Sequence, residues 1–165
     1  MTTARSLAEA EKRELLEFRQ GGMKLLGAGE RDSAESIIER VDGFVYDWQR
    51  RDKALIAKDL SRPDDIIDLA WSLGSVWGAQ LEKTFNWQWA LITENQGEDL
   101  FGMVSPDRSL CLYPSFYVRD CLMEPERDFV AMLSFNMLKA GRFDANPPGQ
   151  YLNFIWNIAR IVPRA

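Results

Sequence analysis

The sequence contains no histidine and only two cysteines, Cys111 and Cys121. The absence of histidine removes the commonest general base and metal ligand, and with them every Ser-His or Cys-His catalytic arrangement. Two cysteines are too few for a thiolate zinc site or a disulfide framework. We therefore expect two reduced, buried thiols, and we expect no metal, nucleotide or other cofactor to be required. Carboxylate chemistry remains open.

Long apolar runs are also absent. No uninterrupted apolar stretch approaches the ~20 residues that a membrane-spanning helix needs, and residues 1–13 lack the apolar core of a signal peptide. Hydrophobic residues make up 46% of the 165 residues and charged residues 27%, which is typical of a soluble globular protein. These features predict a cytoplasmic protein with no membrane contact that forms a single domain, 1–165.

Hydrophobic periodicity divides this domain into three parts. Residues 1–60 are expected to form N-terminal helices, residues 61–122 a central helix followed by strands, and residues 123–165 C-terminal helices. The motif Ser6-Leu7-Ala8-Glu9 has the form of a capping box, so we expect Ser6 to start the first helix. Asp32-Ser33-Ala34-Glu35 predicts the start of a second helix, which should weaken around 50–52 and resume briefly at 55–56.

The third helix is predicted to begin at Ser61-Arg62-Pro63-Asp64, which supplies a cap, a first-turn proline and an acid at the positive end of the helix dipole. Its apolar residues cover so much of its circumference that we expect it to be central and packed on more than one side. Gly74 and Gly78 lie one turn apart, which should allow a neighbouring element to come close.

After Phe85 the hydrophobic period changes to two, which is typical of strands. Strands at 87–93, 100–104 and 110–113, joined by polar turns, predict a three-stranded antiparallel meander. Helices should cover one face of it, in an α+β fold that is about half helix or more. Because those helices need an apolar surface to cover, we expect Trp87 and Trp89 to pack in the core. The alternatives are a partner-facing surface and a stacking site for a sugar or a base.

The third strand should end at Pro114, which an aromatic-rich turn follows. Beyond it, Pro125 is expected in the first turn of a further helix, although the alternation of apolar residues over 129–135 also allows a strand. Residues 146–149 predict a break, and residues 152–160 an amphipathic helix with Trp156 on its apolar side.

Charge is unevenly distributed along the chain. Residues 61–100 contain two basic groups, Arg62 and Lys83, and seven acidic ones, so they account for the whole net charge of −5. These acids are Asp64, Asp65, Asp68, Glu82, Glu94, Glu98 and Asp99. One interpretation is a helix N-terminus and a solvated turn. The other is an acidic patch that binds a basic protein partner. The acidity argues against nucleic-acid binding.

The segments LGSVWGAQL, NWQWALI and LCLYPSFYVRDCL, within residues 66–122, resemble small bacterial domains of unknown function. Those domains share a Leu-Gly-x-x-x-Gly helix, a Trp-bearing hairpin, and a strand that ends in proline before an aromatic-rich turn. Similar small acidic α+β proteins serve as immunity partners of interbacterial toxins. The resemblance implies a cytoplasmic binding protein, and no catalytic residues come with it.

The leading hypothesis is therefore a non-enzymatic protein-binding domain, in the form of an immunity protein that neutralises a toxin with a basic surface. Its candidate partner-binding residues are Glu94, Glu98, Asp99, Asp107 and Arg108. The alternative is a small ligand-binding domain or carboxylate-dependent enzyme. Its candidate residues are Asp107, Arg108, Tyr113, Tyr117, Arg119 and Asp120, which turn chemistry and surface ion pairs would also explain. A structural subunit that self-associates is a third possibility.

Overall fold

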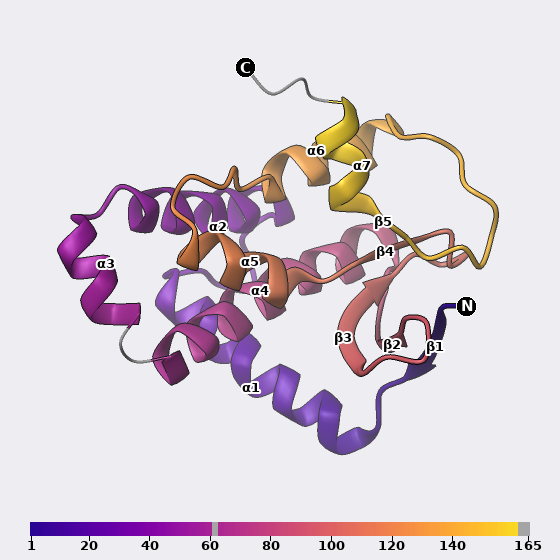
Figure 1. Cartoon of the computed structure of the whole chain (residues 1–165), viewed down its shortest axis with the longest axis horizontal. Helices are drawn as coiled ribbons and strands as arrows, with labels where there is room; N and C mark the ends of the chain where they lie inside the picture. The colour runs from indigo at the N-terminus through magenta and orange to yellow at the C-terminus, as the bar shows by residue number, and fades with distance from the viewer. Residues whose placement is uncertain (61–62, 162–165) are drawn as a thin grey trace.

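A computed structural model of the chain describes residues 1–60 and 63–161 (Figure 1). Helices account for 56% of the chain, so the prediction of a helix-rich α+β fold is confirmed. The described elements are β1 (Thr3–Ser6), α1 (Glu9–Leu25), α2 (Ala34–Gln49), α3 (Lys53–Leu60), α4 (Pro63–Phe85), β2 (Gln88–Thr93), β3 (Asp99–Val104), β4 (Leu110–Leu112), α5 (Pro114–Met123), α6 (Ala131–Ala140), β5 (Leu152–Asn153) and α7 (Phe154–Ile161).

The strands form one sheet in the order β1-β2-β3-β4-β5. The predicted antiparallel meander is present as β2, β3 and β4, but the sheet is larger and mixed. β1 adds an antiparallel edge strand beside β2, with Ser6 opposite Ala90, and β5 pairs in parallel with β4. Both added strands are short and lie at the edges. A prediction of three strands was therefore incomplete.

The placement of Ser6 in β1 shows that the predicted cap of the first helix was wrong. α1 begins at Glu9 with Ala8 as its N-cap residue. The Ala8 N–H donates to a carboxylate oxygen of Glu11 at 2.7 Å, so a glutamate three residues after the cap satisfies one terminal backbone donor. The second helix, by contrast, starts within Asp32-Ser33-Ala34-Glu35 as predicted, and Ser33 caps it, because its hydroxyl oxygen accepts from the Ser36 N–H at 3.1 Å.

Helix α4 is central, as predicted, and packs against α1 on one side and α5 on another (Figure 1). The two glycines mark close approaches. A Cβ atom on Gly74 would lie 2.4 Å from Ser115 Oγ, and one on Gly78 would lie 2.2 Å from the Trp89 ring. The residues Ser61 and Arg62 of the predicted helix start lie outside the described residues.

Trp87, directly before β2, and Trp89, within β2, are both buried in the main core, so the prediction of core packing is confirmed. Trp87 and Trp89 pack with residues of α4 and α5 on the helix-covered face of the sheet. The other face has a smaller apolar cluster that includes Ile92 and Cys111. Cys111 and Cys121 are both free and buried, which agrees with the expected thiols.

The C-terminal half differs from prediction in two helix starts. Pro114 does not lead into an aromatic-rich turn but occupies the first turn of α5. The next helix, α6, begins at Ala131 rather than near Pro125, and residues 124–130 form a loop. Helix was nevertheless the right choice over strand at 131–140, and the break at 146–149 is present.

Candidate functional site

A broad groove with a volume of about 1740 Å³ is present in the described part of the chain. It lies along α5 and the 124–130 loop, and it extends to the α2–α3 junction, to α7 and to the β2–β3 hairpin. Its apolar lining consists of Ile56, Ala57, Leu100, Tyr113, Phe116, Tyr117, Met123, Pro125, Val130, Leu133, Ile155, Trp156 and Ile158.

Helix α5 forms the floor of the groove, because one of its sides is buried against α4 and the other side faces the groove. Ser115, Val118 and Cys121 are buried on the side that packs against α4. On the groove side lie Phe116, Asp120 and Met123. The close contact of Ser115 with Gly74 fixes the distance between the two helices.

Three large apolar side chains of the groove are exposed. Trp156 is 71% exposed, Met123 50% and Leu133 40%, and they come from α7, α5 and α6 respectively. Trp156 is held at the start of α7 by Asn153, whose side-chain oxygen accepts from the Ile155 N–H at 3.1 Å and from the Trp156 N–H at 3.5 Å. Asn153 therefore acts as an N-cap that fixes the backbone beneath the tryptophan.

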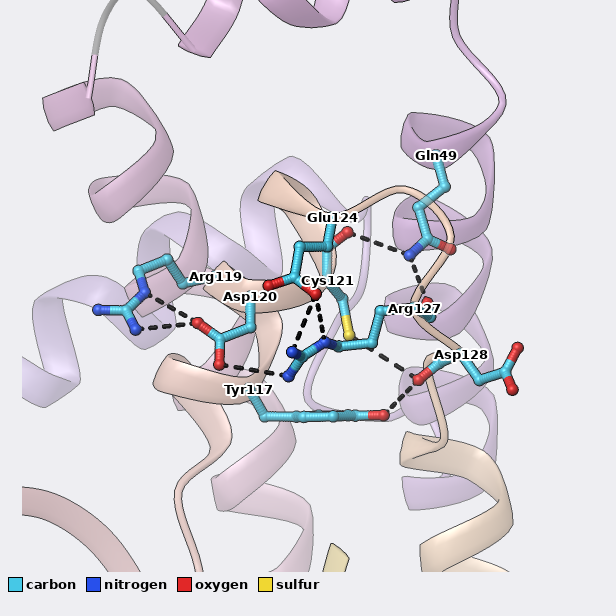
Figure 2. Close-up of polar contacts among 8 residues, drawn as sticks. All are labelled: Gln49, Tyr117, Arg119, Asp120, Cys121, Glu124, Arg127 and Asp128. Atoms are coloured by element: carbon cyan, nitrogen blue, oxygen red, sulfur yellow. Dashed lines mark hydrogen bonds and ion pairs between the residues drawn. The ribbon is translucent and has the colours of Figure 1, made fainter. Parts of the chain in front are cut away.

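Ion pairs cross the C-terminal end of α5 (Figure 2). The guanidinium of Arg127 lies between two carboxylates, at 2.9 Å from Glu124 and 3.5 Å from Asp120. Arg119 contacts the other oxygen of Asp120 at 2.9 Å. The four side chains are partly exposed, so the network orders the loop more than it stabilises the fold.

Side-chain donors of α2 and α5 attach the end of α5 and the 124–130 loop to the rest of the molecule. Gln49 donates to the carbonyl oxygens of Cys121 at 3.0 Å and Arg127 at 2.8 Å (Figure 2). Trp48 donates to the Leu122 carbonyl at 3.0 Å, and Tyr117 donates to the Asp128 carbonyl. These bonds connect α2 and α5 to the loop, so this wall of the groove is built from fixed backbone rather than from a free segment.

Three titratable groups in or beside the groove have raised pKa values. Burial raises the pKa of the Cys121 thiol to about 12, and burial raises the pKa of the Tyr117 hydroxyl above its usual range. Burial and the hydrogen bond to Glu94 raise the pKa of Tyr113 in the same direction. All three groups therefore hold their protons, and none supplies a nucleophile or a general base. Among the described residues, no cluster of three His, Cys, Asp or Glu side chains could bind a metal.

The sequence-predicted partner-binding residues fall at two ends of strand β3. Glu94, Glu98 and Asp99 lie at the β2–β3 turn, and only Glu94 lines the groove, where it accepts a hydrogen bond from Tyr113 Oη at 2.6 Å. Asp107 and Arg108 lie at the β3–β4 turn. A six-residue strand, about 20 Å long, separates the two turns, so the structure does not bring the five residues together.

Asp107 and Arg108 have partners within the fold. Asp107 Oδ1 accepts from the Ser105 hydroxyl and the Ser109 hydroxyl, each at 2.8 Å, and from the Ser109 N–H at 3.0 Å. Those bonds lower the pKa of the Asp107 carboxyl. Arg108 donates to Tyr151 Oη at 3.2 Å, beside β5. Asp107 stabilises the turn, and Arg108 attaches the C-terminal segment to it. Both residues thus have structural roles, and their role in binding a partner stays a prediction.

The residues proposed for an enzyme or ligand site also separate. Tyr113, Tyr117 and Asp120 line the groove, whereas Asp107, Arg108 and Arg119 do not. Sequence reasoning missed Met123, Arg127 and Trp156 as site residues. The amphipathic pattern around Trp156 was visible, but which face α7 leaves uncovered depends on packing between distant segments.

The helices in the described part of the chain include none that combines the length and apolarity needed to cross a bilayer. No family model, curated protein or solved structure matches the chain. The resemblance of residues 66–122 to small bacterial domains of unknown function therefore remains a hypothesis.

Proposed function

We propose that the chain is a non-enzymatic protein-binding domain whose groove receives an apolar segment of a partner protein. The supporting observation is the exposure of Trp156, Met123 and Leu133 around one concave surface. Large apolar side chains that gather on a surface and have a polar rim are typical of protein interfaces. Tryptophan in particular contributes binding energy when a partner buries it.

The charges around the groove favour a basic partner. Five carboxylates line it against three basic groups: Glu94, Asp120, Glu124, Glu126 and Asp128 against Arg51, Lys53 and Arg127. Arg127 is already paired with two of those acids. Glu126 and Asp128 are exposed, and they are available to attract and orient positive charge on an incoming protein.

Neutralisation of a toxin is the specific form of this function that we propose. A small acidic α+β domain that covers a basic surface on a toxin would need a shaped groove and complementary charge, and it would need no catalytic group. The support comes from the resemblance of residues 66–122 and from the acidic lining of the groove.

A small-ligand site is the second candidate. The hydrogen bond between Tyr113 and Glu94 at one end of the groove favours it, because a half-buried phenol beside a carboxylate could orient a polar ligand. Tyr113, Tyr117 and Cys121 hold their protons and supply no nucleophile, so carboxylates such as Glu94 are the bases that such a site offers.

Photo-crosslinking in the cells that produce the protein tests the proposal. A benzophenone amino acid replaces Met123 in the groove, and in a matched variant it replaces Leu25, which is equally exposed at the end of α1. We expect one protein to be captured from position 123 and not from position 25. If that protein is a toxin, its activity should fall in proportion to the amount of the chain added.

Two outcomes would contradict the proposal. Identical adducts from both positions, or none from position 123, would mean that the groove binds no protein. An adduct between two copies of the chain would instead support self-association.

A further inference from the structure

A second, smaller cavity lies where α1, α4 and β3 meet, and its lining shares no residue with that of the groove. Its volume is about 250 Å³, which is below the ~300–1,000 Å³ typical of sites for drug-sized ligands. It is lined by Glu11, Glu14, Leu15, Phe18, Ile67, Asp68, Trp71 and Phe101. A cavity of this size suits one large side chain. We call it the aromatic crevice.

Three rings hold one another in place in the aromatic crevice. The Trp71 ring is stacked on Phe18 with centroids 5.9 Å apart, and it meets Phe101 edge-on at 5.2 Å. All three side chains are half-buried, so their positions are fixed by packing while part of each ring faces the cavity. Such a ring set is organised before any ligand arrives.

Carboxylates complete the lining. Glu11 is paired with Arg5 at 2.8 Å and is therefore already neutralised. Glu14 and Asp68, which come from α1 and α4, have no ion-pair partner among residues 1–60 and 63–161. The aromatic crevice thus combines ring faces with two unpaired negative charges, and it lacks a positive charge of its own.

We propose that the aromatic crevice binds the guanidinium group of an arginine side chain on a partner protein. A cation is attracted to the electron-rich face of an aromatic ring, most strongly to tryptophan. The planar guanidinium can also stack on a ring while its N–H groups donate to carboxylates, which a lysine ammonium cannot reproduce. The aromatic crevice offers ring faces on which a guanidinium can stack and carboxylates to which its N–H groups can donate. This site is separate from the groove and does not depend on its function.

The test uses two small probes on the intact chain. N-acetyl-arginine amide is titrated while NMR spectra follow the Trp71 indole and the Phe18 and Phe101 rings. We expect a saturable shift at these rings with a Kd in the roughly millimolar range. N-acetyl-citrulline amide has nearly the same shape without the charge, and it should bind at least about fivefold more weakly.

Charge-neutral variants supply the second arm. Glu14→Gln combined with Asp68→Asn changes two exposed side chains, so the fold should persist. It should weaken arginine binding about fivefold or more. Glu17→Gln combined with Asp65→Asn removes the same charges from the same helices outside the aromatic crevice and should bind as the unmodified chain does. No saturable shift, equal binding of citrulline, or equal effects of the two double variants would overturn the proposal.

Discussion

Gly74 and Gly43 both lie inside helices, yet their surroundings differ completely. A Cβ atom on Gly74 would lie 2.4 Å from Ser115 Oγ and 2.5 Å from Ser115 Cα, whereas one on Gly43 would meet nothing within 4 Å. Gly74→Ala should therefore lower the free energy of unfolding by about 1–3 kcal/mol, because α5 must move. Gly43→Ala should raise it by about 0.5–1 kcal/mol, because alanine favours helix.

Chemical denaturation of the two variants and the unmodified chain measures both changes. Equal effects of the two substitutions would show that α5 does not approach α4 as closely as the structure has it.

Asp42 on α2 should make stability depend on pH. Burial raises the pKa of its carboxyl from about 3.8 to about 6; a hydrogen bond from the Met132 N–H at 3.3 Å opposes the rise, and the nearby Glu39 adds to it. The folded state therefore holds this proton more tightly than the unfolded state. Ionisation of Asp42 costs stability above pH 6, and the cost disappears as the pH falls towards 4.

Replacement by a neutral amide removes this cost. We expect Asp42→Asn to be more stable than the unmodified chain by about 1–2 kcal/mol at pH 8, with the difference shrinking towards pH 4. Thermal unfolding at a series of pH values measures it, and Asp47→Asn, an exposed position on the same helix, is the control. A difference that stays constant with pH would show that the Asp42 carboxyl is not perturbed.

Residue burial was predictable where periodicity was strong. Trp87 and Trp89 alternate onto the same face of the predicted strand, the face against which helices were expected to pack, and both are buried. Trp156 belongs to an equally regular pattern, yet it is exposed, because no other element of the described chain covers that side of α7. Periodicity identifies an apolar face, and only the three-dimensional arrangement decides what lies against it.

At the scale of elements, Asn153 should determine whether α7 forms. Its side chain accepts from the N–H groups of Ile155 and Trp156, and loss of such a cap costs about 1 kcal/mol. Asn153→Ala should therefore speed amide hydrogen exchange in residues 154–158, whereas Asn136→Ala, on the exposed face of α6, should not. Unchanged exchange in α7 after Asn153→Ala would mean that packing alone holds this helix.

The elements that sequence reasoning missed have ambiguous local signals. Pro114 can end a strand as well as begin a helix, and here it does both, at the junction of β4 and α5. β1 and β5 are edge strands of four and two residues, too short to show an alternating pattern. Their pairing partners, β2 and β4, are distant in sequence, so only the folded chain reveals them.

At the scale of the molecule, the acidic window 61–100 does not form one patch. Glu82 pairs with Arg19 at 3.1 Å, Asp68 lines the aromatic crevice, and Glu94 lines the groove. The net charge of the window was visible in the sequence, but the fold distributes its members over different surfaces. The groove also takes acids from outside the window, such as Glu126 and Asp128.

Charge reversal at the groove should slow association with a basic partner. Glu126→Lys combined with Asp128→Lys should reduce the association rate constant several-fold at low salt, and added salt should shrink the difference. Thermal stability should change little, because both side chains are exposed. Glu17→Lys with Glu30→Lys gives the same change of net charge outside the groove. Stopped-flow rates that fall equally for both pairs would assign the effect to net charge rather than to the groove.

The affinity of the partner captured at position 123 for the Trp156→Ala variant shows whether the groove is the binding site. Trp156 is exposed, so its removal should leave the fold intact. If the groove is the binding site, titration calorimetry should show a Kd raised about 30-fold or more, the loss typical of a central tryptophan. Leu25→Ala, outside the groove, should stay within about twofold of the unmodified chain. A Trp156→Ala variant that binds as tightly as the unmodified chain would show that the partner does not bind in the groove.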